Sequence, residues 1–291
     1  MSVQSRYAHC AGYEVHYMDW GTTLGPDAPV VVAWHGLART GRDMDALAQF
    51  LVGQGFRVIC PDTIGRGFSQ WSRDPKAEYC LRFYARLARE LFDVLGIARA
   101  HWVGTSMGGA IGTVCASGLF EPSMRGRIAS LVLNDNAPQL ADAAIERIKS
   151  YAGTLPVFDT LGQLEQFFRA AYAPFGWLSD AEWRKLTETS TRRLSNGRVT
   201  PHYDPAITQQ FTEHHDDYRL WAHYDVLDLP VTLLRGVDSD LVLAPTAREM
   251  QTRGPGARGL LEWVEVPGCG HAPALNVQTH FDAVLRCLRR G

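Results

Sequence analysis

The 291-residue sequence has no long hydrophobic run and little lysine. Its longest apolar stretches, residues 30–34 and 229–234, are as short as strands, whereas a helix that crosses a bilayer needs roughly 20 apolar residues. The 29 basic and 31 acidic residues are interspersed and give a net charge of −2, so the basic patch that binds nucleic acid is missing. Lys76, Lys149 and Lys185 are the lysines, and none lies in a phosphate-binding P-loop motif. We expect neither a membrane nor a nucleic acid as a partner.

The sequence also lacks the cysteine spacing that is typical of zinc and redox sites, because no two of its six cysteines form a Cys-x-x-Cys pair. Residues 1–20 contain no apolar segment of the kind found in secretion signals, so nothing indicates export to an oxidising compartment. We therefore expect a cytoplasmic protein without disulfides. The thiols expected to be reduced and buried are Cys10, Cys60, Cys80, Cys115, Cys269 and Cys287.

Short apolar runs alternate with helical patterns along most of the chain. This alternation is typical of a mostly parallel sheet with helices on both faces, which is the α/β fold class. The expected strands are residues 12–18, 29–34, 56–60, 100–104, 128–133, 230–234 and 260–266. The expected helices are residues 41–53, 79–96, a segment that begins at 106, and 272–289.

The alternation of strand and helix patterns stops between residues 136 and 225. This stretch is helical in pattern, lacks good strands and is rich in aromatic residues. The strands before and after this stretch behave as neighbours in one sheet, so the stretch interrupts a single fold. We predict a core domain made of residues 1–135 and 226–291. Residues 136–225 then form a helical cap, which is inserted after the sixth strand.

The strongest local motif is Gly104-Thr105-Ser106-Met107-Gly108-Gly109, which has the form G-x-S-x-G. It follows an apolar strand and precedes a helix. A serine on such a sharp turn adopts strained backbone angles and needs small neighbours. The turn exposes the hydroxyl of Ser106 at the carboxyl edge of the sheet, next to a helix N-terminus that favours negative charge. The motif therefore predicts a nucleophile.

The residues expected to act together with Ser106 lie in the loops that follow other predicted strands. The turn at residues 34–37 offers the backbone N–H of Leu37 to an oxyanion, and the N–H of Met107 is a second donor. His271 lies in a glycine-rich loop after the last strand, and residues 236–240 supply an acid after the penultimate strand. The chain order is serine, acid, histidine.

On these residues the sequence resembles the α/β-hydrolase family from about residue 12 to residue 289. The resemblance implies an eight-stranded, mostly parallel sheet flanked by helices, and no metal or cofactor. The segments that carry it are His35-Gly36, Asp62-x-x-Gly65-Arg66-Gly67-x-Ser69, Gly104-x-Ser106-x-Gly108-Gly109, Asp240 and Gly270-His271.

The resemblance also implies the role of each residue. Ser106 attacks the substrate and forms an acyl-enzyme, and His271 takes the serine proton and later returns it. Asp240 holds the histidine, because its Ser-Asp-Leu context is similar to the acid position of the family. Asp238 in the same loop and Asp135 after the preceding strand are the alternatives.

Two further patterns favour structural explanations. The cluster Glu213-His214-His215-Asp216-Asp217 lacks the spacing of a zinc motif, so we interpret it as a solvated helix face. Gly65-Arg66-Gly67 lacks the third glycine of a dinucleotide fingerprint, and we expect a tight surface turn there.

A serine nucleophile reduces the number of reactions that this chain can catalyse. Epoxide hydrolases and haloalkane dehalogenases need a carboxylate where Ser106 stands. The C–C bond hydrolases usually resemble G-N-S-M-G-G and carry tryptophan after the histidine, whereas this chain has Thr105 and Ala272. The sequence also resembles a bacterial subgroup that includes hydroxyalkanoate-oligomer esterases, at Asn134-Asp135, Tyr203-Asp204-Pro205 and residues 235–241.

We therefore predict a serine hydrolase that cleaves a small-molecule carboxylic ester in an apolar, capped pocket. The alternatives are a C–C bond hydrolase of the β-ketolase type, or a lactonase, on the same triad. A third is a non-catalytic small-molecule binding protein. The acyl chain and the leaving group depend on how the cap covers Ser106, and the sequence carries no signal of oligomeric state.

Overall fold

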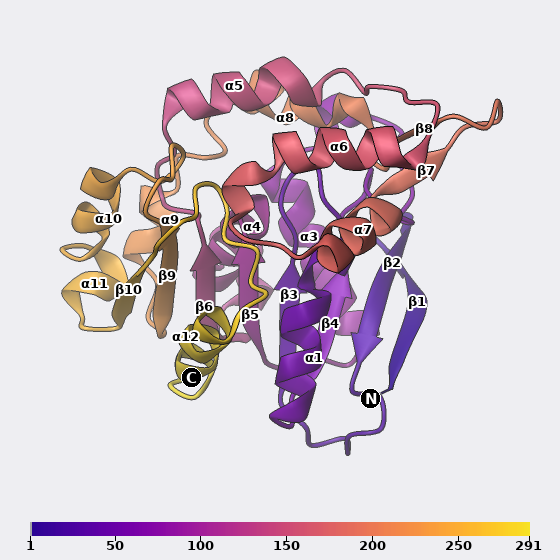
Figure 1. Cartoon of the computed structure of the whole chain (residues 1–291). Helices are drawn as coiled ribbons and strands as arrows, with labels where there is room; N and C mark the ends of the chain where they lie inside the picture. The colour runs from indigo at the N-terminus through magenta and orange to yellow at the C-terminus, as the bar shows by residue number, and fades with distance from the viewer. Residues whose placement is uncertain (1) are drawn as a thin grey trace.

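The computed structural model describes residues 2–291 and contains one eight-stranded sheet (Figure 1). The spatial order is β1-β2-β4-β3-β5-β6-β9-β10. β1 pairs antiparallel with β2, and β2 with β4, while the other neighbours are parallel. The strands are β1 (Val3–Cys10), β2 (Tyr13–Trp20), β3 (Val30–Trp34), β4 (Arg57–Pro61), β5 (Ala100–Thr105), β6 (Ile128–Asn134), β9 (Val231–Gly236) and β10 (Leu261–Val266). The predicted α/β-hydrolase fold is confirmed.

Helices cover both faces of this sheet, so its central strands β3, β5 and β6 are buried along almost their whole length. One hydrophobic core joins the sheet to α3 (Leu81–Val94) and α4 (Met107–Ser117). A second core, on the opposite face, joins it to α1 (Asp45–Gly53) and α12 (Gln278–Leu288). The shorter elements of the core domain are η1 (Gly41–Met44), α2 (Pro75–Glu78), η2 (Pro122–Met124), α10 (Ala244–Met250) and α11 (Gly254–Ala257).

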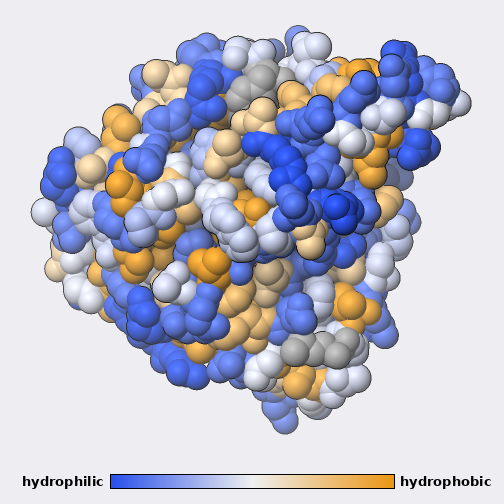
Figure 2. Space-filling model, in the orientation of Figure 1, coloured by the Kyte–Doolittle hydropathy of each residue, from blue (hydrophilic) through white to orange (hydrophobic). Residues whose placement is uncertain are grey.

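The chain leaves the sheet after β6 and returns at β9. The segment between them lies over the carboxyl ends of the strands in Figure 1, and hydrophilic residues cover much of the outer surface of α6 and α7 in Figure 2. A small core of Leu164, Phe168 and Val199 packs one part of this segment, while other residues of it, such as Ile148 and Tyr224, join the core that contains α3 and α4. We call the segment the cap. Its elements are α5 (Asp142–Ala152), α6 (Leu161–Ala171), η3 (Ala173–Phe175), α7 (Asp180–Thr189), β7 (Thr191–Arg193), β8 (Val199–Pro201), η4 (Pro205–Gln209), α8 (Gln210–Glu213) and α9 (Trp221–Asp225).

Three elements differ from the expectation. The edge strand is β1, which the sequence pattern did not indicate because Ala8 and Cys10 are its only buried residues. The cap contains the hairpin β7–β8, whose turn holds the hairpin signal Asn196-Gly197. The last helix begins at Gln278 rather than at residue 272, because residues 272–277 form an irregular loop after His271.

The six cysteines are free and buried. Among residues 2–291, no helix combines the length and the apolar character that crossing a membrane requires.

His101 makes the stability of the fold depend on pH. It lies on β5, its Nδ1 is 2.9 Å from Ser130 Oγ, and burial lowers its pKa to about 4. Because an unfolded histidine has a pKa near 6.5, the unfolded state binds a proton first as the pH falls. The stabilisation is therefore complete above about pH 6.5 and is lost towards pH 4.

We expect the His101→Gln variant to flatten this dependence. Between pH 4 and pH 6.5 the slope of the unfolding free energy against pH should decrease by up to one bound proton, measured by urea unfolding. His215→Gln, at an exposed histidine, is the matched control and should keep the wild-type slope. Equal slopes for His101→Gln and wild type would contradict the assignment.

Candidate active site

Ser106 stands on a strained turn between β5 and α4. Its backbone has a φ of 52° and a ψ of −118°, which non-glycine residues rarely adopt. The neighbouring glycines allow the turn: a Cβ atom at Gly108 would lie 2.2 Å from the carbonyl oxygen of Trp34, and one at Gly104 would lie 2.2 Å from the backbone of Gly108. The predicted sharp turn at Ser106, which we call the elbow, is therefore present, and Ser106 lines a cavity.

The backbone amides of Leu37 and Met107 flank the serine. Both residues border a small apolar cavity of about 20 Å³ that also touches Ser106. Within residues 2–291, neither amide N–H donates a hydrogen bond to another backbone group outside the regular elements. This arrangement suits the stabilisation of an oxyanion.

The side chain of Arg66 contacts both Leu37 and Met107. Its Nε donates to the Leu37 carbonyl oxygen at 2.8 Å, and its Nη2 lies 3.4 Å from the Met107 sulfur. Its Nη1 donates to Tyr84 Oη and to the Ile64 carbonyl oxygen. The side chain is fully buried, so the expected surface turn at residues 65–67 is wrong. The sequence showed the motif but not its burial.

His271 is paired with Asp135. The distance from His271 Nδ1 to Asp135 Oδ2 is 2.7 Å, and Asp135 is completely buried at the end of β6. The end of β9 and the loop after it supply two donors to this carboxylate, the N–H of Gly236 at 3.0 Å and the hydroxyl of Ser239 at 2.6 Å. With Nδ1 so bound, the histidine's Nε2 is left for the serine.

The prediction that Asp240 holds the histidine is wrong. Its side chain is half exposed and accepts a hydrogen bond from Arg147 Nε of the cap at 2.9 Å, and Arg147 Nη2 lies 2.7 Å away in the same ion pair. Asp238 is also exposed. In this loop Ser239 is the residue that points inward, so the loop supports the acid instead of providing it.

Asn134 fixes the histidine loop to the sheet, a function that sequence reasoning missed. Its Nδ2 donates to Thr105 Oγ1 at 3.0 Å and to the Pro273 carbonyl oxygen at 2.8 Å. It therefore links the nucleophile turn to the segment that follows His271. The pair Asn134-Asp135 after β6 was the available signal.

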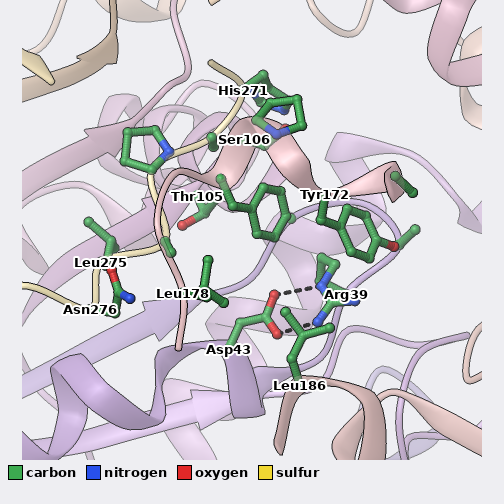
Figure 3. A pocket seen from close by; sticks show the side chains of 18 of the residues that line it. Arg39, Asp43, Thr105, Ser106, Tyr172, Leu178, Leu186, His271, Leu275 and Asn276 are labelled. Carbon is green, nitrogen blue, oxygen red and sulfur yellow. Dashed lines mark hydrogen bonds and ion pairs between the residues drawn. The ribbon is translucent and has the colours of Figure 1, made fainter. Parts of the chain in front are cut away.

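The cavity in front of Ser106 has a volume of about 540 Å³ and lies between the cap and the carboxyl edge of the sheet. Figure 3 shows Ser106 and His271 near each other in its wall, with Leu178, Leu186 and Leu275 among the apolar side chains. The wall is not wholly apolar, contrary to expectation. Its charged side chains are Arg39, Arg42, Asp43, Asp45, Arg147, Glu182, Lys185, Asp238 and Asp240.

Arg39 is the buried cation of this wall. It forms a bidentate ion pair with Asp43 and lies over the ring of Tyr172 (Figure 3). Burial alone would lower its pKa, but the Asp43 carboxylate and the Tyr172 phenol outweigh burial, and the pKa lies above its ordinary value. The guanidinium is therefore permanently charged.

The cluster at residues 213–217 lies in the cap, away from Ser106. Asp217 accepts a hydrogen bond from the N–H of Leu81 at 2.6 Å, and His214 Nε2 is 2.7 Å from the Lys76 carbonyl oxygen. These side chains bind the cap to the core domain.

Comparison with known proteins shows the family of the chain. The α/β-hydrolase fold model matches residues 29–276, and the chain therefore belongs to that family. It is 36% identical over 271 residues to the 3-hydroxybutyrate-oligomer hydrolase of Cupriavidus necator, which covers 90% of this chain and 88% of that protein. The esterase Rv0045c of Mycobacterium tuberculosis is 26% identical over 241 residues, which cover 81% of this chain and 75% of that protein.

Among solved structures, an α/β hydrolase from Novosphingobium aromaticivorans is 30% identical and superposes with a TM-score of 0.84, covering 99% of each chain. The resemblance to esterase-like α/β-hydrolases that the motifs indicated is thus confirmed.

The close approach at Gly108 can be tested by adding a methyl group. Gly108→Ala should lower the unfolding free energy by about 1–3 kcal/mol, because the new Cβ would overlap the Trp34 carbonyl oxygen. Gly53→Ala, at a helical glycine with open space around it, should leave stability unchanged or raise it slightly. Urea unfolding measures both, and equal stabilities would contradict the packing described.

Proposed function

We propose that this chain hydrolyses carboxylic esters through an acyl-enzyme on Ser106. The observation that carries the proposal is the convergence of the strained serine and the His271–Asp135 pair on one cavity. This constellation generates a nucleophile from an alcohol, because the paired imidazole accepts the serine proton as the oxygen attacks.

The reaction follows from the positions of the groups. Ser106 Oγ attacks the ester carbonyl carbon, and its proton passes to His271 Nε2. The N–H groups of Leu37 and Met107 bind the developing oxyanion, and Asp135 stabilises the imidazolium through Nδ1. The imidazolium then protonates the departing alcohol. Water, activated by the same histidine, releases the acid and restores the serine.

The proposed substrates are esters of short hydroxy acids. This choice is supported by the 36% identity to a 3-hydroxybutyrate-oligomer hydrolase and by a cavity wall that mixes apolar and charged side chains. C–C bond hydrolysis and lactone opening would use the same side chains and are separated from ester hydrolysis by a substrate panel. The cytoplasmic location expected from the sequence stays a prediction.

An esterase assay tests the reaction itself. Wild type should hydrolyse short and medium nitrophenyl esters, and Ser106→Ala should lose about 10⁶-fold in kcat. A fluorophosphonate should label wild type at Ser106 and leave Ser106→Ala unlabelled. If no ester is cleaved although Ser106 is labelled, lactones and C–C substrates become the next candidates. An unlabelled wild type would support the binding-protein alternative.

Exchanging each carboxylate for its amide tests the identity of the acid. Asp135→Asn should lower kcat by about 10⁴-fold, because the amide no longer holds the reactive tautomer of His271. Asp240→Asn, which changes an exposed ion pair with Arg147, should stay within a few-fold of wild type. The reverse order of the two effects would restore Asp240 as the acid.

A further inference from the structure

Arg39 and Ser106 occupy the same short stretch of the cavity wall. A Cβ atom at Gly36 would lie 3.6 Å from Ser106 Cβ and 3.8 Å from Arg39 Cγ, so the two side chains flank this glycine. Figure 3 shows the guanidinium of Arg39 beside Tyr172, in the wall of the cavity that contains Ser106. A substrate held at Ser106 therefore extends past Arg39 when its longer part enters this cavity.

The hydrogen bonds of the guanidinium are incomplete. Nε donates to Asp43 Oδ2 at 2.7 Å, and Nη2 donates to Asp43 Oδ1 at 2.6 Å and to Ser190 Oγ at 2.9 Å. Nη1 is buried and has no hydrogen-bond partner among residues 2–291. A buried donor without a partner destabilises the protein. A ligand oxygen that accepts a hydrogen bond from this donor removes the penalty, and the free energy so regained strengthens ligand binding.

Two aromatic rings lie next to the Arg39 guanidinium. The ring centroids of Tyr172 and Phe168 are 4.6 Å and 5.8 Å from Arg39 Cζ. Both rings belong to the cap, and Tyr172 is partly exposed. Because Nη1 is buried, a substrate oxygen reaches it only if a neighbouring cap side chain such as Tyr172 moves aside when the substrate binds.

The charges nearby favour a neutral acceptor. Asp43 already balances Arg39, and the cavity wall as a whole carries five carboxylates against four cations, which are Arg39, Arg42, Arg147 and Lys185. A carboxylate at Nη1 would therefore meet no unbalanced positive charge and would lie close to Asp43. An ester carbonyl or hydroxyl oxygen accepts the hydrogen bond without this repulsion.

We propose that Arg39 is a specificity-determining residue that binds a second, neutral ester oxygen in the substrate, so that the site prefers oligoesters to simple esters. The inference rests on the proposed esterase function. The longer, oxygen-rich part of the substrate occupies the large cavity, and the small apolar cavity beside Leu37 and Met107, at about 20 Å³, has room for a methyl-sized group only. An alkyl chain of equal length would leave Nη1 unpaired.

Matched substrates distinguish the effect of the second ester group on kcat/KM from the effect of chain length. Methyl 3-acetoxybutanoate carries two ester groups. Hexan-2-yl acetate and methyl 3-methylhexanoate each replace one of them by two methylene groups. Free 3-acetoxybutanoate ends in a carboxylate. For each substrate, kcat/KM from pH-stat titration is divided by its rate of hydroxide hydrolysis, which removes differences in intrinsic reactivity.

Wild type should prefer the diester to both monoesters and to the carboxylate by about 10-fold or more, the effect of one hydrogen bond to a charged group. Arg39→Lys should lose most of this preference, because lysine lacks the second arm of the guanidinium. Arg253→Lys is the matched control and should keep the preference. Arg253 also pairs with an aspartate and lies over an aromatic ring, but it is remote from the cavity.

If Arg39→Lys does not fold, the double variant Arg39→Met/Asp43→Leu removes the ion pair as a unit and should lose the preference too. Equal rates of wild type on diester and monoesters would overturn this inference while the esterase function stands. A preference that survives the Arg39 variants would also overturn it, as would faster cleavage of the carboxylate than of the diester. Failure to cleave all four substrates, together with the nitrophenyl esters, would instead overturn the proposed function.

Discussion

The hydrogen bond between His271 and the buried carboxylate of Asp135 is the interaction on which the rest of the site depends. A buried carboxylate needs donors, and the structure supplies them from the last residue of β9, through the N–H of Gly236, and from the loop that follows, through the hydroxyl of Ser239. The acid is therefore held by one strand and its donors by the next. The histidine that it orients comes from a third segment, so a change in any of the three would displace the imidazole.

The serine side of the site is built by close backbone packing. Gly104 and Gly108 let β5 and α4 approach until a single methyl group would not fit, and this approach imposes the positive φ of Ser106. Arg66 then holds the facing turn through the Leu37 carbonyl oxygen. Stability and chemistry are coupled here, because the contacts that strain the serine also set the positions of the two backbone N–H groups.

The sequence predicted the sheet, the cap and the elbow because each has a local signal: apolar runs, a change of rhythm, and glycines around Ser106. It did not predict which carboxylate meets His271. Asp135 and Asp240 both follow strands at the same edge of the sheet, and side-chain direction decides between them. Asp135 points inward, whereas Asp240 points towards Arg147 and solvent. The burial of Arg66 was missed for the same reason, since burial depends on contacts between residues distant in the sequence.

The most direct measurement of the central claim is the mass of the enzyme during turnover. Rapid acid quenching after mixing with nitrophenyl butyrate, followed by intact-mass and peptide analysis, should find one butyryl group on the peptide that contains Ser106. The adduct should build up before the steady state when water attack is the slower step. Steady turnover with an acyl group on another residue would contradict the account.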